Sequence, residues 1–188
     1  MPFFKKLSDA KLVKKVIEEN QEWYEEIVKR YQPKLLRYAK YLTGDDHQAE
    51  DVVQEALIKA FVNLKGFNSN RGKFSSWIYR ICHNEAVSLL KSEKKWVSMD
   101  KYEWLKESFA GKENVERDFL KKEAKKEVRS CLGKLAVDYR AVLSLFYLED
   151  KKYEEIGEIL KIPTGTVGVR LKRGKEKLKE ICNNSGEV

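Results

Sequence analysis

Hydrophobic and polar residues alternate along most of this chain with the period of an α-helix. The longest apolar stripe recurs every three or four positions for about four turns. It consists of Ala49, Val52, Val53, Ala56, Leu57, Ala60, Phe61 and Leu64. The opposite side of this predicted helix holds Asp51, Gln54, Glu55, Ile58 and Val62. Acidic groups beside apolar side chains are unusual on a face that meets only water, so we interpret this face as a docking surface for a protein.

A second helix is predicted to begin near Ser75, a residue type favoured as an N-cap. Its core stripe contains Ile78, Cys82, Ala86, Leu89 and Leu90. Its other face contains Trp77, Arg80, Ile81, Asn84, Ser88 and Lys91. Rings stack on bases, cations bind phosphates and an amide reads a base edge, so this face suits single-stranded nucleic acid. The alternative is that Trp77 and Ile81 pack inward and that the cations are only solvated.

The connection between these two helices, residues 65–73, is polar and basic. It contains Gly66, Phe67, Asn68, Asn70, Arg71 and Gly72. It is either an ordinary turn or a loop that captures an unstacked base, because a ring stacks on a base and the asparagines form hydrogen bonds with it.

The remaining patterns predict an all-α protein. Three prolines in 188 residues leave long helical periods uninterrupted. Ser8 caps a predicted helix over Asp9–Glu19, and a longer stretch runs from Gln21 or Glu22 to Thr43 and ends at Gly44. Further helices are predicted over 119–132, 138–148, 153–160 and 164–182. We therefore expect two small helical domains, 1–95 and 118–188, joined by a linker, 96–117.

The second domain contains the pattern of a DNA-binding helix–turn–helix over residues 153–175. Gly157 provides the small residue at the helix crossing, Ile162 the apolar residue of the turn, and Val167 and Leu171 the inward positions of the second helix. The residues predicted to meet DNA are Thr164, Thr166, Val169, Arg170, Lys172 and Arg173. The alternative is a generic helical hairpin with a solvated basic face.

Net charge and cysteine content limit the partners, sites and cellular compartment that are expected for this chain. A net charge of +8 and a pI near 9.2 favour a polyanionic partner. The three cysteines form no C-x-x-C pair, so neither a zinc site nor a disulfide framework is indicated, and a reducing cytoplasm is expected. No signal peptide, membrane-spanning run, metal site or cofactor is expected. His47 and His83, the only histidines, are predicted to be surface residues.

Three runs carry a family resemblance. The run Asp46-His47-Gln48-Ala49-Glu50-Asp51-Val52-Val53-Gln54-Glu55-Ala56 closely resembles the core-polymerase-binding helix of bacterial sigma factors. The run Gly72-Lys73-Phe74-Ser75-Ser76-Trp77-Ile78-Tyr79-Arg80-Ile81-Cys82-His83-Asn84-Glu85-Ala86 resembles their −10-recognition helix. The run Pro163-Thr164-Gly165-Thr166-Val167, with Arg170 and Leu171, resembles their −35-recognition helix. Two domains and a short linker are typical of the extracytoplasmic-function group.

The resemblance implies a promoter-specificity subunit that binds core RNA polymerase, recognises the −10 and −35 elements and supports DNA opening. The implied polymerase contacts are Asp51, Gln54, Glu55 and Ile58. The implied contacts with the single-stranded −10 element are Phe67, Asn68, Asn70, Arg71, Trp77, Arg80, Asn84 and Lys91. The helix–turn–helix residues above would meet the −35 duplex, although Gly168 and Val169 replace the usual Lys-Ser of the group. An inhibitory anti-sigma protein is also implied.

Two other functions compete with this one. An autonomous helix–turn–helix regulator would act without polymerase, but it needs a dimer interface or an effector pocket, and neither is evident in the sequence. A nuclease is disfavoured because no H-E-x-x-H, G-x-S-x-G or phosphate-binding glycine loop is present, so no catalytic residue is predicted.

Overall fold

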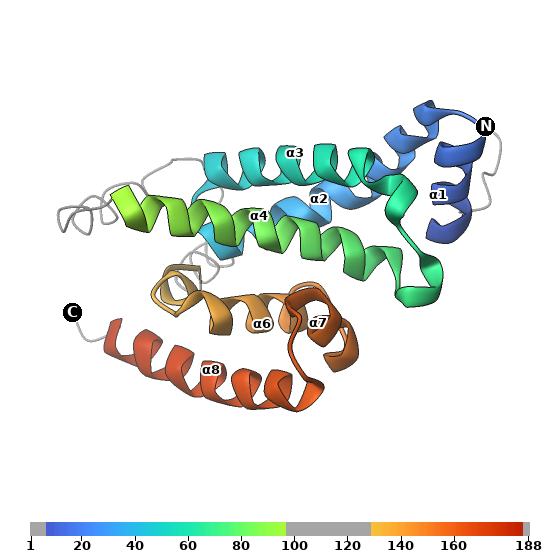
Figure 1. Ribbon diagram of the computed structural model, residues 1–188. Coiled ribbons are helices and arrows are strands. Elements are labelled where there is room, and N and C mark those ends of the chain that lie inside the picture. The colour runs from blue at the N-terminus through green and yellow to red at the C-terminus, as the bar shows by residue number, and fades with distance from the viewer. Residues whose placement is uncertain (1–6, 97–128, 186–188) are drawn as a thin grey trace, which may run out of the picture.

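The protein is helical throughout the part of the chain that the computed structural model describes, residues 7–96 and 129–185 (Figure 1). The elements in chain order are α1 (Asp9–Glu18), η1 (Gln21–Trp23), α2 (Tyr24–Thr43), α3 (Asp46–Val62), η2 (Leu64–Gly66), η3 (Ser69–Arg71), α4 (Phe74–Trp96), α6 (Val137–Tyr147), α7 (Tyr153–Leu160) and α8 (Thr164–Ser185). Residues 129–133 are also helical. The predicted all-α class is confirmed. Among these helices, none is both long and apolar enough to span a membrane.

The boundaries of the first helices follow the predicted capping residues. The Ser8 side chain accepts a hydrogen bond from the Lys11 N–H at the start of α1. Gly44 ends α2 in the left-handed conformation, with φ 84°, which glycine adopts without a Cβ penalty. The Asp45 side chain then caps α3 by accepting from the Gln48 N–H at 2.8 Å. The turn between α2 and α3 is therefore fixed by local sequence.

Helices α2, α3 and α4 pack on one another, with α1 across one end (Figure 1). The predicted inward positions of α3 are buried except Phe61, whose ring is 38% exposed and lies 4.9 Å, centroid to centroid, from that of Tyr24. Placing Phe61 in the core was wrong, because its side chain lies at the surface beside Tyr24. In α4 the residues Ile78, Cys82 and Ala86 are fully buried, as predicted.

The second unit consists of residues 129–133, α6, α7 and α8. A Cβ on Gly157 would stand 2.9 Å from the Ile162 carbonyl oxygen, so the turn needs glycine there, as predicted. Val167 and Leu171 are buried, as predicted, whereas Tyr153 is 39% exposed. The predicted linker after Trp96 and most of the predicted helix over 119–132 lie outside the described residues.

A disulfide joins Cys131 to Cys182 and ties the helical residues 129–133 to the far end of α8. The expectation that the cysteines form no disulfide was wrong. The two residues are 51 positions apart, and their Cα atoms come within 5.6 Å only because α8 folds back beside the start of this unit. Cys82 is a free, buried thiol, and burial raises its pKa to about 12.

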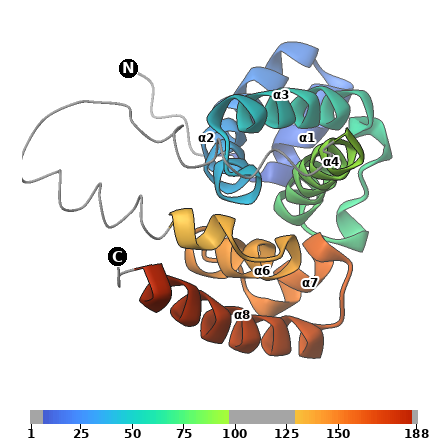
Figure 2. The same cartoon turned by 90° about the vertical axis from the view of Figure 1, so that its left-hand side faces the viewer.

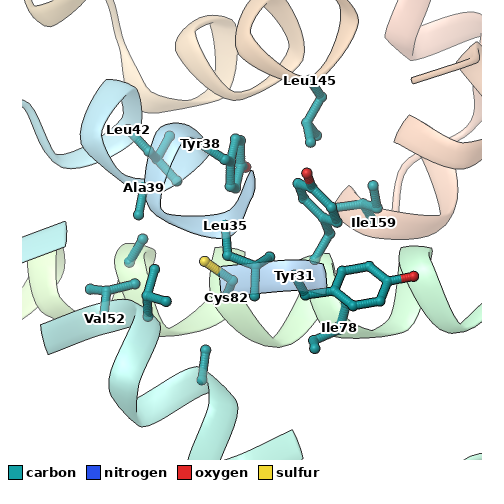
Figure 3. Packing of buried hydrophobic residues seen from close by; sticks show 14 of the residues in the cluster. Tyr31, Leu35, Tyr38, Ala39, Leu42, Val52, Ile78, Cys82, Leu145 and Ile159 are labelled. Atoms are coloured by element: carbon teal, nitrogen blue, oxygen red, sulfur yellow. The ribbon is translucent and has the colours of Figure 1, made fainter. Parts of the chain in front are cut away.

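The two helical units lie against each other as two layers, with α6 and α7 facing α2 and α4 (Figure 2). Leu145 and Ile159 from the second unit belong to the same buried cluster as Tyr38 and Ile78 from the first (Figure 3). The main polar contact between the units is made by Glu149, whose carboxylate accepts hydrogen bonds from Arg37 Nε at 2.6 Å and from the Tyr79 hydroxyl at 2.5 Å. The interface thus combines apolar burial with a directed ion pair.

Candidate functional site

The first candidate surface is the outer face of α3. Asp51, Gln54, Glu55 and Ile58 are all exposed, as predicted. The Ile58 side chain is 51% exposed and that of Val62 is 71% exposed. Glu55 has one partner, the ammonium of Lys59 at 3.3 Å, which also binds Glu85 of α4 at 2.7 Å. The face therefore offers carboxylates and apolar side chains together, with few internal contacts to be broken on docking.

A groove of about 930 Å³ runs beside this face, between α3 and the start of α2. Its apolar lining comes from Tyr24, Val28, Leu36, Val53, Leu57, Ile58 and Phe61, and its polar lining from Gln21, Glu22, Glu25, Gln32, Glu50 and Gln54. The Tyr24 hydroxyl donates to the Leu57 carbonyl oxygen at 2.6 Å and holds the two helices together at the groove. Such a groove fits an amphipathic helix that carries apolar and basic side chains.

Val28 and Leu36 line the groove and are not part of the buried row of α2. Both are half-buried, whereas Ile27, Tyr31 and Leu35 are buried. The sequence spacing already separates these residues from the core, because Val28, Gln32 and Leu36 form a row of their own at i, i+4 and i+8, beside the core row of α2.

The second candidate surface is formed by the loop before α4 and the first turns of that helix. The rings of Phe67, Phe74 and Trp77 form a cluster with centroids 5.3–5.5 Å apart. Phe74 is buried, whereas Phe67 and Trp77 are half-buried and pack against the edge of the core. Trp77 is therefore neither sealed in the interior nor free in solvent. One side of the ring packs inward, and part of the ring remains accessible.

The polar residues predicted for this surface are largely accessible. Asn68, Asn70, Arg71, Asn84 and Lys91 are exposed. The Asn68 side-chain oxygen accepts from the Asn70 N–H at 2.9 Å and caps the short helix η3, which leaves its amide N–H groups for other partners. Gly72 has φ 152° and completes the turn into α4. The loop is therefore an ordered connection that still presents amides and a guanidinium outward.

Two cations of this second surface contact the second helical unit. The Lys73 ammonium lies 3.0 Å from a carboxylate oxygen of Glu155, which raises the pKa of Lys73. The Arg80 guanidinium donates from Nε and Nη2 to the Glu158 carbonyl oxygen, at 2.9 Å and 2.5 Å. Glu155 is half-buried, because α7 lies against α4.

His83 is also placed differently from its prediction. It is half-buried, and its Nδ1 lies 2.8 Å from the hydroxyl of the fully buried Tyr38. Burial lowers the pKa of His83 to about 4, with opposing smaller effects from Asp138 and Arg170. The prediction of a surface histidine was wrong because the second unit covers this flank of α4. His47 is exposed, as predicted.

The third candidate surface is the outer side of α8, which faces away from the first unit (Figure 1). Thr164, Val169, Lys172 and Arg173 are exposed, and Thr166 and Arg170 are half-buried. The Arg170 guanidinium is 2.8 Å from a carboxylate oxygen of Asp138 on α6, so it is partly neutralised within its own unit. Gly174 lies where α8 crosses α6, because a Cβ there would be 3.3 Å from side-chain atoms of Leu143 and Tyr139.

Comparison with known proteins assigns both helical units to a single family. The family description "Sigma-70 region 2" matches residues 27–96, and "Sigma-70, region 4" matches residues 125–178. The chain is 33% identical over 183 residues to the ECF RNA polymerase sigma factor SigW of Bacillus subtilis, covering 90% of this chain and 94% of that protein. It is 34% identical over 178 residues to the ECF RNA polymerase sigma-E factor of Escherichia coli K12, covering 90% and 92% respectively.

Solved structures share the arrangement of helices. CnrH, in complex with the cytosolic domain of CnrY, superposes with a TM-score of 0.70 at 22% identity, covering 94% of this chain and 97% of that chain. The sigma factor RpoE of Bartonella quintana, in complex with the anti-sigma factor NepR, gives a TM-score of 0.64 at 21% identity and covers 85% of this chain and 96% of that one. At these identities the likeness supports the fold.

Proposed function

Because the chain belongs to the sigma-70 family, in its extracytoplasmic-function (ECF) group, we propose that its three exposed surfaces divide the work of a promoter-specificity factor among them. The chain is a sigma factor that binds core RNA polymerase and directs it to promoters. The observation that carries this conclusion is that region 2 and region 4 match the two helical units in the expected order. Residues 1–95 form the polymerase-binding and −10 domain in this proposal, 96–117 the linker and 118–188 the −35 domain.

The outer face of α3 and the adjacent groove form the polymerase-docking surface in this proposal. Asp51 and Glu55 supply carboxylates for basic side chains of the partner, and Ile58 supplies apolar contact. The groove supports this assignment, because its apolar lining and acidic rim suit an amphipathic helix better than a nucleic acid. Gln54 belongs to both the face and the groove lining and would join the two contacts.

The loop before α4 and the exposed face of α4 bind the melted −10 strand in this proposal. Phe67 and Trp77 offer rings for stacking, and Asn68, Asn70 and Asn84 offer amides for base edges. Arg71, Arg80 and Lys91 neutralise phosphates. The half-buried state of Trp77 suits this role, since packing against Phe67 and Phe74 would hold the ring in one orientation before a base arrives.

The outer side of α8 meets the −35 duplex in this proposal. Thr164, Thr166 and Val169 lie near the start of the helix, where side chains reach base edges, and Lys172 and Arg173 lie where cations reach phosphates. Arg170 would exchange its pair with Asp138 for a phosphate or a base. In this proposal the contacts with the melted −10 strand and with the −35 duplex therefore lie on separate surfaces.

The decisive experiment changes the α3 face without changing the core. Asp51→Lys with Glu55→Lys reverses two exposed charges one helical turn apart, and we expect loss of co-elution with core polymerase and of promoter-dependent transcription. The matched control, Glu176→Lys with Glu180→Lys, makes the same charge change at the same spacing on exposed positions of α8. If the α3 variant still co-elutes with core enzyme, the docking assignment is wrong.

The competing function is an autonomous helix–turn–helix regulator. Such a protein would bind a duplex site tightly and specifically without polymerase, whereas a sigma factor opens promoters only with core enzyme. Comparing duplex binding and promoter opening, each with and without core enzyme, separates the two. Members of this family are transcription factors, so we also propose that the chain catalyses no reaction of its own.

We extend the proposal to a protein inhibitor and a cellular location. Two structural neighbours are described as complexes, one with the anti-sigma factor NepR and one with the cytosolic domain of CnrY. An anti-sigma partner for this chain is proposed by analogy, and the α3 face and its groove are the apolar surface it would cover. Because the chain would bind core polymerase, we propose that it acts in the cytoplasm.

A further inference from the structure

The side chain of Val169 points away from its own helical unit. Val167, Leu171 and Gly174 form the buried row of α8. Val169 comes two residues after Val167, about 200° around the helix, and so lies almost opposite this row. It is 50% exposed, and α8 is the helix of the second unit that lies farthest from the first unit (Figure 2). Val169 therefore stands on the side of α8 that is turned to solvent.

The fold of the second unit does not account for the pair Gly168-Val169. A Cβ on Gly168 would lie 3.5 Å from the ring of Tyr153, an ordinary van der Waals distance, so packing leaves room for a side chain there. Glycine and the β-branched valine both favour a helix less than alanine or lysine does. An isolated exposed valine is common on protein surfaces, but this one weakens a helix in which it buries little area. The pair indicates a role in binding rather than in folding.

The neighbours of Val169 on the same side of α8 are small before it and cationic after it. Gly165, four residues earlier, is exposed, and no atom lies within 4 Å of the point where its Cβ would stand. Lys172 and Arg173, three and four residues later, are exposed in the next turn. Glycine leaves the approach to Val169 clear, and the cations can bind phosphates on either side of it. This side of α8 can therefore bring Val169 close to base edges.

The chemistry of valine limits what it can recognise in DNA. Its side chain neither donates nor accepts a hydrogen bond, so it cannot read the N7, O6 or amino groups of the bases. The apolar group that base pairs present in the major groove is the C5-methyl group of thymine. Among the described residues of α8, Val169 is the only large apolar side chain that is exposed. A methyl group is thus the ligand that this position fits.

We propose that Val169 contacts the C5-methyl group of a thymine in the major groove of the −35 element, so that this factor requires thymine at one −35 position. This inference rests on the proposed function, because it takes the outer side of α8 as the side that meets the duplex. The flanking Lys172 and Arg173 fix the register of the helix on the phosphates, and Val169 selects the base.

The test uses the complete holoenzyme, which is this chain bound to core RNA polymerase, with linear promoter fragments. Promoters with a randomised −35 element are first selected for transcription by the wild-type holoenzyme. Each thymine of the selected element, on either strand, is then replaced singly by deoxyuridine, which lacks only the C5-methyl group. Single-round transcription in competition with the unsubstituted promoter measures each effect. Deoxyuridine in the spacer between the two promoter elements is the DNA control.

The protein variants separate the methyl groups of Val169 from its position. Val169→Ser and Val169→Thr both introduce a hydroxyl, but only the threonine keeps a methyl group on Cβ. Ile17→Ser is the control, because it removes an exposed apolar side chain from α1, away from the proposed contacts. Circular dichroism checks that each variant keeps its helix content.

We expect one −35 thymine at which deoxyuridine weakens competition by the wild-type holoenzyme about fourfold, the effect of withdrawing one methyl group from an apolar contact. Deoxyuridine in the spacer should have no effect. Val169→Ser should use the thymine and deoxyuridine promoters equally. Val169→Thr should keep part of the preference, and Ile17→Ser should keep all of it.

Two results would overturn the thymine contact. The first is that no thymine of the selected −35 elements can be distinguished from deoxyuridine by the wild-type holoenzyme. The second is that Val169→Ser keeps the wild-type preference at the sensitive position. In both cases transcription from the selected promoters leaves the proposed function standing. If the chain directs core polymerase to no promoter of the pool, the proposed function fails and the thymine contact fails with it.

Discussion

The half-buried His83 should make the free energy of unfolding depend on pH between about 4 and 6.5. Its Nδ1 lies 2.8 Å from the Tyr38 hydroxyl. Burial raises the pKa of Tyr38 well above its usual value, so this hydroxyl keeps its proton and shares a hydrogen bond with the neutral ring. The perturbation is His83→Asn, because the asparagine amide can donate or accept a hydrogen bond with Tyr38 while the side chain loses the ability to titrate.

The magnitude follows from the pKa of His83, which burial lowers from 6.5 to about 4. The unfolded chain binds the proton near pH 6.5, and the folded chain binds it only near pH 4, so the contribution to stability is complete above pH 6.5. It is lost progressively as the pH falls from 6.5 towards 4. The difference corresponds to about 3 kcal/mol in the free energy of unfolding, of which about 2 kcal/mol is lost by pH 5.

The assay is urea unfolding followed by circular dichroism at pH 7, 6 and 5, at constant ionic strength. The wild-type free energy of unfolding should fall more steeply than that of His83→Asn, by about 2 kcal/mol at pH 5 relative to pH 7. His47→Asn, at an exposed position, is the control and should keep the wild-type slope. Parallel curves for wild type and His83→Asn would refute the reasoning, because they would mean that the folded chain protonates His83 as readily as the unfolded chain does.

Three further outcomes are expected. Gly157→Ala should lower the free energy of unfolding by about 1–3 kcal/mol, since its Cβ would stand 2.9 Å from the Ile162 carbonyl oxygen, whereas Gly165→Ala, with no atom within 4 Å, should change it by less than about 1 kcal/mol in thermal melts. Reducing the Cys131–Cys182 disulfide should lower the urea midpoint of the wild-type chain, with a loss of about 2–4 kcal/mol, and should leave a Cys131→Ser variant unchanged. Leu145→Ala removes a fully buried side chain at the contact between the units and should cost about 2–5 kcal/mol by urea unfolding; a cost below about 1 kcal/mol would mean that the units do not share a core.

The contact between the two units combines polar and apolar interactions. Its polar part includes the contacts of Glu149 with Arg37 and Tyr79 and further pairs such as Arg129 with Asp46. Its apolar part includes Leu145 and Ile159.

The sequence by itself determined the helices, the helix–turn–helix and the exposed face of α3. Each of these features depends on residues within a few positions of one another, since a cap, a turn or a stripe at i, i+3 and i+4 is local. The predicted bounds of α7 match the structure, and Gly157 stands at the predicted crossing. The family resemblance was likewise carried by short runs of adjacent residues.

Only the tertiary structure decided which faces meet. The Tyr79–Glu149 hydrogen bond joins residues 70 positions apart, and the Arg80–Glu158 contact joins residues 78 positions apart. Periodicity identifies an apolar or a charged side of a helix but does not identify what covers it. The burial of His83, the Cys131–Cys182 disulfide and the occupied cations of α4 were therefore missed, because each arises where residues remote in sequence are brought together by packing.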